Sequence, residues 1–269
     1  MPELPEVEAI CRKLRRQVTG LRITGGCVER PSVTRPQKPH WILSRVVGRV
    51  MDSVERRGKH ILLQLSGGWV LLIHLRMTGN LVVVPDVRFR SPAVRAWLEM
   101  EGGRGLVFED PRALGRMRLL RPGEDRTALE AVGVEPLSSE FTSEQFLMIA
   151  SRSRLPAKLF LMDQGRVAGL GNIYAAEALF RAGIHPARPM HRIRRARLEA
   201  LHGHIIAVLE EAVASAEHAY EAPGRLLETE EFVCAVYGRR GEHCLRCGRC
   251  IRRMPQGGRS TYYCPGCQR

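Results

Sequence analysis

Two pairs of cysteines near the C-terminus constrain the fold of this chain more than any other feature. Cys244 and Cys247 form one Cys-x2-Cys pair, sixteen residues follow, and Cys264 and Cys267 form the second pair. Four thiolates at this spacing are typical of a tetrahedral Zn²⁺ site that closes across a small hairpin. The stretch between the pairs has β-branched and aromatic residues around a Gly257–Gly258 turn, which predicts two short strands.

The same segment is strongly basic. Residues 238–269 contain eight arginines, one glutamate and no aspartate or lysine, so they carry +7 of the chain's formal net charge of +14. A basic hairpin held by a metal is typical of phosphate contact. The alternative is a zinc ribbon that only holds the C-terminus or binds a protein. We interpret Cys250, a fifth cysteine here, as free, because its ligation in place of Cys247 gives an unusual spacing.

Length and composition bound the remaining possibilities. At 269 residues the chain exceeds the usual size of a single core, which predicts two domains. No apolar run approaches the roughly 18 residues of a membrane span, and the first residues lack the apolar stretch of a signal peptide. The cysteines outside the two pairs show no pairing pattern, so we expect reduced thiols and a cytoplasmic, monomeric protein without a membrane partner.

The fold class that the sequence predicts is α+β, in several domains. A helical pattern covers residues 3–18, and short β-rich runs between about 21 and 120 predict an antiparallel sandwich or barrel. Helical patterns then follow, with a Ser/Thr-capped start before 143 and a further start after the glycine turn at 168–171. We expect a β-rich domain at 1–130, a linker at 131–140, a helical domain at 141–235 and a zinc finger at 236–269.

The first residues of the chain include a candidate nucleophile and two carboxylates. Removal of the initiator methionine would leave Pro2 as a secondary amine, and an α-amine with a pKa of about 8 is partly neutral at pH 7. Its attack on a sugar C1′ gives an iminium cation that acidifies the neighbouring C2′ hydrogen and leads to strand cleavage by elimination. Glu3 is placed to act as general acid, and Glu6 to orient the amine. The alternative is that these residues only begin the first helix.

Motifs along nearly the whole chain, taken together, resemble the formamidopyrimidine-DNA glycosylase family, which also contains the endonuclease-VIII-like enzymes. MPELPE at the start is closer to the formamidopyrimidine branch than an MPEGPE start would be. The further motifs are RRGKHILLQL at 56–65, HLRMTG at 74–79, DPRALGR at 110–116, GVEPLS at 133–138, the run from AKLFLMDQ to AGIHP at 157–186, VYGRRGEHCLRCG at 236–248 and GRSTYYCPGCQR at 258–269.

The resemblance implies a catalytic N-terminal β-sandwich flanked by helices, a helix–two-turn–helix domain and a zinc-finger β-hairpin. It implies double-stranded damaged DNA as the partner, one structural Zn²⁺ per chain as the cofactor, and action at the nucleoid of a bacterium. The implied activity is that of a bifunctional DNA glycosylase and AP lyase, which excises ring-opened or 8-oxo purines and cleaves the strand by β/δ-elimination.

The resemblance also assigns residues. Pro2 matches the nucleophile and Glu3 the acid, while Lys59, Asn172 and Arg259 match phosphate contacts near the lesion. A glycine turn feeding a helix gives Asn172 an independent physical case as an anion ligand. Two further matches keep an alternative: Lys158 lies near the damaged nucleotide or on a solvated helix face, and His74 is a phosphate donor or a buried structural histidine.

An extruded nucleotide leaves a void in the duplex that side chains must fill. The positions that match the family's void-filling residues are Met77, Arg112 and Leu114. Leu114 stands where the family has an aromatic residue, which gives it less stacking surface. Residues 215–232 are acidic where the family has a glycine-rich segment over oxidised guanine, so we expect weaker discrimination of oxidised guanine from its ring-opened forms.

Two alternatives remain open at this point. One keeps the chemistry but takes oxidised pyrimidines or bulky lesions as substrate. The other, from a different class, is a non-catalytic zinc-finger protein that binds damaged DNA. The PELPE start favours a catalyst, because a protein that only binds DNA has no use for an N-terminal proline.

Overall fold

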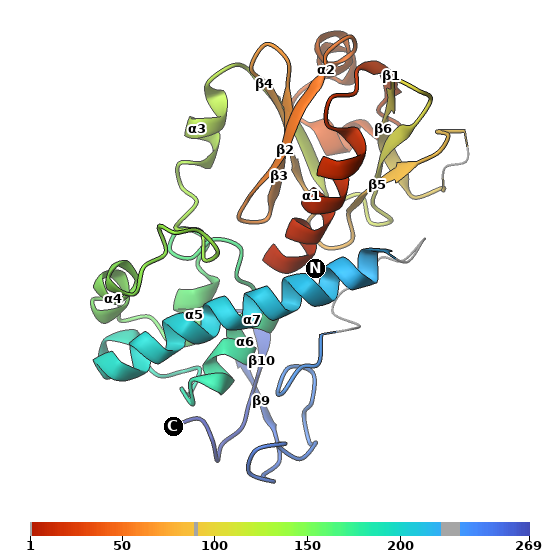
Figure 1. Ribbon diagram of the computed structural model, residues 1–269. Coiled ribbons are helices and arrows are strands. Elements are labelled where there is room, and N and C mark those ends of the chain that lie inside the picture. Colours follow the sequence, from red (N-terminus) through yellow and green to blue (C-terminus); the bar gives the residue numbers. More distant parts are fainter. Residues whose placement is uncertain (1, 89–90, 222–231) are drawn as a thin grey trace. The chain divides into compact units, whose positions relative to one another are not determined.

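The computed structural model describes residues 2–88, 91–221 and 232–269 (Figure 1). The chain forms two compact units. The first contains the residues up to Glu130 and the end of helix α7 from Ala216, and the second spans Ala131–Ser215 together with the C-terminal segment to Arg269. Among the described residues, no helix is both long and apolar enough to cross a membrane.

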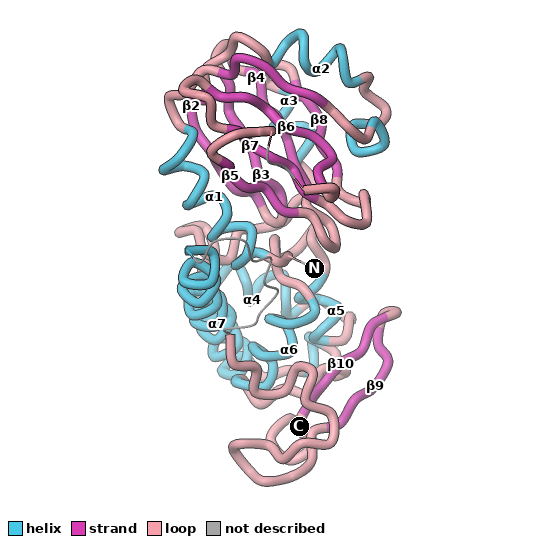
Figure 2. Tube along the Cα trace, turned by 90° about the vertical axis from the view of Figure 1, so that its right-hand side faces the viewer, coloured by secondary structure: helices cyan, strands magenta, loops and turns pink. Residues whose placement is uncertain are grey.

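Two four-stranded antiparallel sheets form the centre of the first unit (Figure 2). One sheet has the strand order β1-β6-β7-β5 and the other β2-β3-β4-β8, and one apolar core gathers side chains from both, which confirms the predicted sandwich. Buried and half-buried residues alternate along β6, as expected where one face of a strand packs inward. The strands are β1 (Ile23–Cys27), β2 (Met51–Arg57), β3 (His60–Leu65), β4 (Trp69–His74), β5 (Asn80–Val84), β6 (Val94–Met100), β7 (Gly105–Glu109) and β8 (Arg116–Leu120).

Helices flank this sandwich. In α1 (Leu4–Val18), side chains at helical spacing, including Leu4, Val7 and Leu14, are buried, and most of them belong to the same core as the sheets. Basic residues in its last turn suit the negative end of the helix dipole. The shorter α2 (Pro39–Val46) and α3 (Glu124–Leu129) complete the unit.

Register brings chemically useful residues to one end of the second sheet. β2 and β3 are joined at Gly58 and Lys59, and Gly58 takes a positive φ of 56° that suits glycine. On the neighbouring pair of strands, His60 lies opposite His74. Lys59, His60 and His74 therefore lie at the same end of this sheet.

The second unit is helical and ends in a hairpin. Thr142 caps α4 (Ser143–Ser151) by accepting from the backbone N–H of Gln145 at 3.2 Å, as the sequence predicted. The two strands β9 (Arg252–Gln256) and β10 (Arg259–Tyr263) pair around the predicted glycine turn. The other helices are α5 (Ala157–Met162), α6 (Asn172–Arg181) and α7 (Arg195–Glu221).

Candidate active site and nucleic-acid interface

The start of α1 holds the candidate catalytic residues in a reciprocal capping box. The backbone N–H of Glu3 donates to Oε2 of Glu6 at 2.7 Å, and the Glu3 carboxylate accepts from the backbone N–H of Glu6. Pro2, Glu3 and Glu6 are all buried. The amide that Glu6 binds is the one that joins Pro2 to Glu3.

His60 and His74 form a second cluster, next to Lys59. Their rings are nearly perpendicular with centroids 4.7 Å apart, and Nδ1 of His74 accepts the backbone N–H of Arg76 at 3.0 Å. Burial, followed by the nearby His60, Arg76 and Lys59, lowers the pKa of His74 to about 3. His74 is therefore a neutral imidazole at pH 7 with its proton on Nε2. Any contact it makes to phosphate is a neutral hydrogen bond.

Two turns present the predicted void-filling residues to solvent. Met77 is 40% exposed and Leu114 39% exposed, although both are apolar, and Arg112 is exposed as well. Each apolar residue directly follows a non-glycine residue in the left-handed region, Arg76 at φ 59° and Ala113 at φ 52°. Such conformations carry strain of about 1 kcal/mol or more and persist only where neighbouring contacts hold them.

Asp110 holds both turns and was missed from the sequence. Its side chain is fully buried, and Oδ1 accepts the hydroxyl of Thr78 and the backbone N–H of Arg112, while Oδ2 accepts the N–H of Gly115 at 2.7 Å. A side chain on Gly115 would come within 2.4 Å of Phe108. The Asp-Pro that directly follows β7 is the sequence pattern that indicates such a turn.

Lys158 is not on a solvated helix face. The side chain is fully buried on α5, so that alternative is wrong, and its place near the damaged nucleotide stays a prediction. Its Nζ donates to the carbonyl of Ser260 at 3.1 Å and to Oγ1 of Thr261 at 2.6 Å. The amphipathic pattern of a short helix could not reveal that a hairpin about 100 residues later covers it.

Asn172, the first residue of α6, binds the same carbonyl. Its Nδ2 donates to the Ser260 oxygen at 3.2 Å and to the hydroxyl of Tyr237 at 3.3 Å. Arg259, one residue before Ser260, is exposed at the start of β10. Asn172 therefore contacts the residue that directly follows Arg259, and the assignment of both residues to phosphate stays a prediction.

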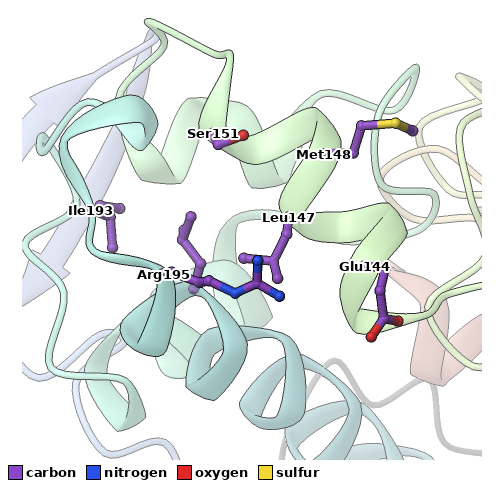
Figure 3. A pocket seen from close by; sticks show the side chains of 7 residues that line it. Glu144, Leu147, Met148, Ser151, Ile193 and Arg195 are labelled. Atoms are coloured by element: carbon purple, nitrogen blue, oxygen red, sulfur yellow. The ribbon is translucent and has the colours of Figure 1, made fainter.

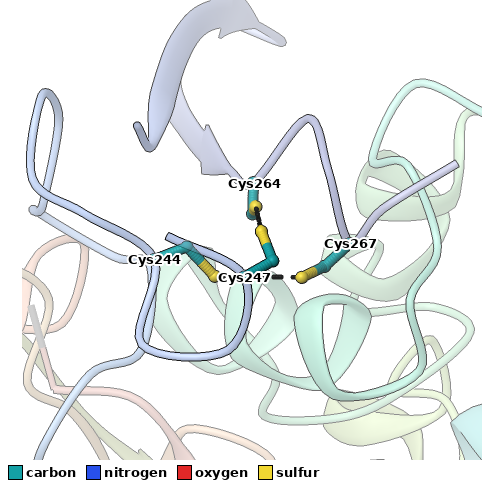
Figure 4. Close-up of side chains that lie close together, drawn as sticks. All are labelled: Cys244, Cys247, Cys264 and Cys267. Atoms are coloured by element: carbon teal, nitrogen blue, oxygen red, sulfur yellow. Dashed lines mark hydrogen bonds between the residues drawn. The ribbon is translucent and has the colours of Figure 1, made fainter. Parts of the chain in front are cut away.

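The four predicted metal ligands come together at the base of the hairpin (Figure 4). Their sulfurs all lie within 4.8 Å of one another, and the pairs Cys244–Cys267 and Cys247–Cys264 are 3.8 and 3.4 Å apart. A tetrahedron with Zn–S bonds of about 2.3 Å has edges of about 3.8 Å, so the site fits Zn²⁺. The backbone N–H of Arg249 lowers the pKa of Cys247 to about 7, which favours the thiolate. Cys250 is exposed and outside this group, as predicted.

Glu177 is a second residue that the sequence did not reveal. Its carboxylate is buried in α6 and accepts three consecutive backbone N–H groups, those of Ala235, Val236 and Tyr237, at 2.8 to 3.0 Å. Burial of a carboxylate is tolerated where several donors satisfy it. This contact fixes the chain at the entrance to the zinc finger.

A cavity of the helical unit is separate from these residues. A pocket of about 350 Å³ lies between α4 and the start of α7, with Leu147 and Met148 on one side and Ile193 on the other (Figure 3). None of the predicted site residues lines it.

Comparison with known proteins identifies the family. Residues 1–117 match the formamidopyrimidine-DNA glycosylase N-terminal domain, residues 132–222 match the H2TH domain of the same enzymes, and residues 241–269 match the zinc finger found in FPG and IleRS. The formamidopyrimidine-DNA glycosylase of Chloroflexus aurantiacus is 40% identical over 274 residues, which cover 100% of this chain and 98% of that protein. The chain belongs to the formamidopyrimidine-DNA glycosylase family.

Solved structures of the formamidopyrimidine-DNA glycosylase family share this fold. The MutM (Fpg) protein of Thermus thermophilus is 37% identical, with a TM-score of 0.83 and coverage of 99% of this chain and 98% of that one. The Lactococcus lactis protein in complex with a FAPY-dG containing DNA is 28% identical, with a TM-score of 0.88 and coverage of 99% and 100%. These matches confirm the predicted fold class, including the zinc-finger hairpin.

The acidic segment that departs from the formamidopyrimidine-DNA glycosylase pattern is only partly described. Its first residues, up to Glu221, continue helix α7, and Glu217 forms an ion pair with Arg12 of α1 at 3.0 Å. Residues 222–231 lie outside the described part of the chain, and the prediction about how this segment treats oxidised guanine lies there with them.

Proposed function

We propose that this chain is a base-excision-repair DNA glycosylase with AP lyase activity, acting on oxidised purines in duplex DNA. The observation that carries the proposal is the capping box of Glu3 and Glu6, which directly follows the buried Pro2 in a member of the formamidopyrimidine-DNA glycosylase family. A binding module has no need of such an arrangement. The catalyst is therefore favoured over a non-catalytic damage-binding protein.

The base is displaced in the first step. The neutral Pro2 nitrogen attacks C1′, the bond from C1′ to the base breaks, and the base leaves with the bonding electrons and takes up the N–H proton that the amine gives up. Glu3 protonates the ring oxygen as the sugar opens, and the nitrogen lone pair forms an iminium with C1′. Glu6 keeps the Pro2–Glu3 peptide in place through its 2.7 Å hydrogen bond.

Strand cleavage follows from the iminium. Loss of a C2′ proton sends its electrons toward the cationic nitrogen, and the bond from C3′ to oxygen breaks to release the 3′ phosphate. A second elimination breaks the bond from C5′ to oxygen. Water then hydrolyses the iminium and restores the Pro2 amine.

Contacts to the sugar–phosphate backbone come from both units. We assign phosphate contacts to Lys59 and His74 in the first unit, the latter as a neutral Nε2–H donor, and to Asn172 and Arg259 in the second. Lys158 receives a different role from the one expected: it positions Arg259 by holding Ser260 and Thr261. The zinc finger presents this arginine, and Zn²⁺ takes no part in the chemical steps.

Three exposed side chains are proposed to fill the space that the extruded nucleotide leaves. Met77 and Leu114 stand clear of the core on strained turns, which is the geometry expected of wedges and not of packing residues. Arg112 can donate to the estranged base, which suits cytosine because its pairing edge offers acceptors.

The proposal extends to organisation and location. We assign residues 1–130 as the catalytic domain, 131–140 as the linker, 141–235 as the helix–two-turn–helix domain and 236–269 as the zinc finger. The protein is proposed to act as a monomer on bacterial chromosomal DNA, and hence in the cytoplasm.

One experiment tests the function. The protein is incubated with duplexes that carry a ring-opened guanine, 8-oxoguanine, an oxidised pyrimidine or an abasic site, with and without borohydride. We expect excision of the two oxidised purines and a covalent adduct on the abasic duplex. Binding without an adduct would show a non-catalytic protein. Preferential excision of the oxidised pyrimidine would show that oxidised pyrimidines, and not oxidised purines, are the substrate class.

A further inference from the structure

The last turns of α7 are held by two adjacent residues of α1. Arg12 Nη1 lies 3.0 Å from Oε2 of Glu217, and the Lys13 ammonium donates to the carbonyl oxygen of Tyr220. A cation at the last carbonyls of a helix also suits the negative end of its dipole. Arg12 is itself held by Glu8 of the same helix at 2.9 Å.

Tyr220 adds an apolar contact to this arrangement. Its side chain is only 7% exposed and belongs to the core of the first unit, together with Val7 and Ile10 of α1. Burial and then the charge of Glu6 raise the pKa of its phenol, so the phenol is neutral.

The packing around these contacts is incomplete. A cavity of about 170 Å³ remains between α1 and the end of α7, and Lys13, Glu217 and Tyr220 are among its lining residues. Ala216 and Tyr220 of α7 pack against the core of the first unit. The contacts of Arg12 with Glu217 and of Lys13 with Tyr220 add to this packing.

We propose that Arg12 and Lys13, by binding Glu217 and Tyr220, form a clasp that positions the N-terminal catalytic residues. The path is short: Tyr220 shares the core of the first unit with Val7, Val7 directly follows Glu6 in α1, and Glu6 holds the backbone N–H of Glu3 at 2.7 Å, in the amide that carries Pro2. A shift of the first turn of α1 by about 1 Å is enough to reduce a chemical step up to about 100-fold. This inference rests on the proposed function.

The experiment compares excision with covalent trapping in four variants of the full-length zinc protein. Lys13→Met removes the donor to Tyr220 and Lys13→Arg keeps one, while Tyr220→Ala removes the ring and Tyr220→Phe keeps it. Glu199→Gln, which breaks an exposed ion pair with Arg195 at the other end of α7, is the matched control. Single-turnover excision of 8-oxoguanine, DNA affinity and borohydride trapping on an abasic duplex are measured for each.

We expect Lys13→Met and Tyr220→Ala to reduce the single-turnover rate constant about tenfold and to slow borohydride trapping in parallel, with DNA affinity within about twofold of the unmodified protein. Lys13→Arg, Tyr220→Phe and Glu199→Gln should retain the rate. Unchanged excision in Lys13→Met, or an equal loss in Lys13→Arg, overturns the clasp. Because Lys13→Met leaves the core intact, this holds even where Tyr220→Ala folds poorly. Absence of trapping in the unmodified protein would instead overturn the proposed function.

Discussion

The hydroxyl of Thr78 donates to the carboxylate of Asp110, and this bond joins two turns that are far apart in the sequence. Met77 projects from one turn and Leu114 from the other, each after a residue with a left-handed backbone. One buried carboxylate therefore sets the spacing of two exposed apolar side chains.

Replacing Asp110 by asparagine should reduce base excision by more than the accompanying loss of stability explains. The amide offers one oxygen where the carboxylate offered two, so a buried N–H of Arg112 or Gly115 loses its acceptor, at a cost of about 1–3 kcal/mol. Urea unfolding should show this loss, and excision should fall further than unfolding explains. Thr78→Ser keeps a hydroxyl and should behave as the unmodified protein. Equal losses in both variants would contradict the role of Asp110.

The nucleophile assignment predicts the behaviour of Pro2→Gly. A primary amine on a flexible residue replaces a rigid secondary one, so borohydride trapping should weaken or disappear while DNA binding stays largely intact. Glu3→Gln should reduce base excision more than cleavage at a pre-formed abasic site. Unchanged trapping in Pro2→Gly would exclude the proline, and equal losses at both steps would exclude Glu3 as the acid of the glycosidic step.

Lys158 and Arg259 should give different salt dependences. Arg259→Ala removes a phosphate contact, so the slope of log affinity against log salt should fall by about 1. Lys158→Met fills the buried site but frees Ser260 and Thr261, so affinity should fall about tenfold with a smaller change in slope. The double variant should lose little beyond Arg259→Ala. Fully additive losses would show that Lys158 does not act through Arg259.

The metal site predicts different behaviour for substitutions of Cys247 and Cys250. Zinc binding contributes folding free energy to the finger, so Cys247→Ser should release the metal and lower DNA affinity while the first unit stays folded. Cys250→Ser should retain both metal and affinity, because Cys250 lies outside the sulfur cluster. Metal content by mass spectrometry of the native protein decides the matter, and the reverse result would refute the ligand set.

His74 predicts a pH dependence of stability. Its folded pKa of about 3 lies below the unfolded value of about 6.5, so between these values the unfolded chain binds more protons. Stability should therefore fall as the pH decreases from about 6.5, by at most about 1.4 kcal/mol per pH unit. In His74→Gln, urea unfolding at pH 7 and 5 should show a smaller difference. His40→Gln, at an exposed position of the same unit, should keep the full difference.

Local patterns predicted most of the fold but not all of its elements. The runs at 60–65, 80–84 and 105–109 coincide with β3, β5 and β7, because they are apolar and bounded by turns. β1 was not predicted, since its glycines and polar residues give no alternation, and α2 lies within a stretch assigned to strands. The helix that begins at Ala157 ends at Met162, and the Asp163 side chain accepts the Gly165 N–H in the turn that follows.

Some site residues could be predicted from local sequence, and others could not. The cysteines and the PELPE start are recognisable because their chemistry is local and their spacing is specific. The environment of Lys158, and the roles of Asp110 and Glu177, depend on partners between 2 and about 100 residues away that meet only in the folded chain. Sequence patterns give little indication that a charged side chain is buried.

The grip of Glu177 on residues 235–237 has a consequence for metal exchange. We expect this anchor to keep the chain before Cys244 attached to α6 when the ion is lost, so that the first two cysteines stay close to the helical unit. The thiols keep a high effective concentration with respect to each other, and recapture of a metal ion is then governed by a short tether. We therefore expect Glu177 to speed the binding of a new metal ion by the metal-free finger.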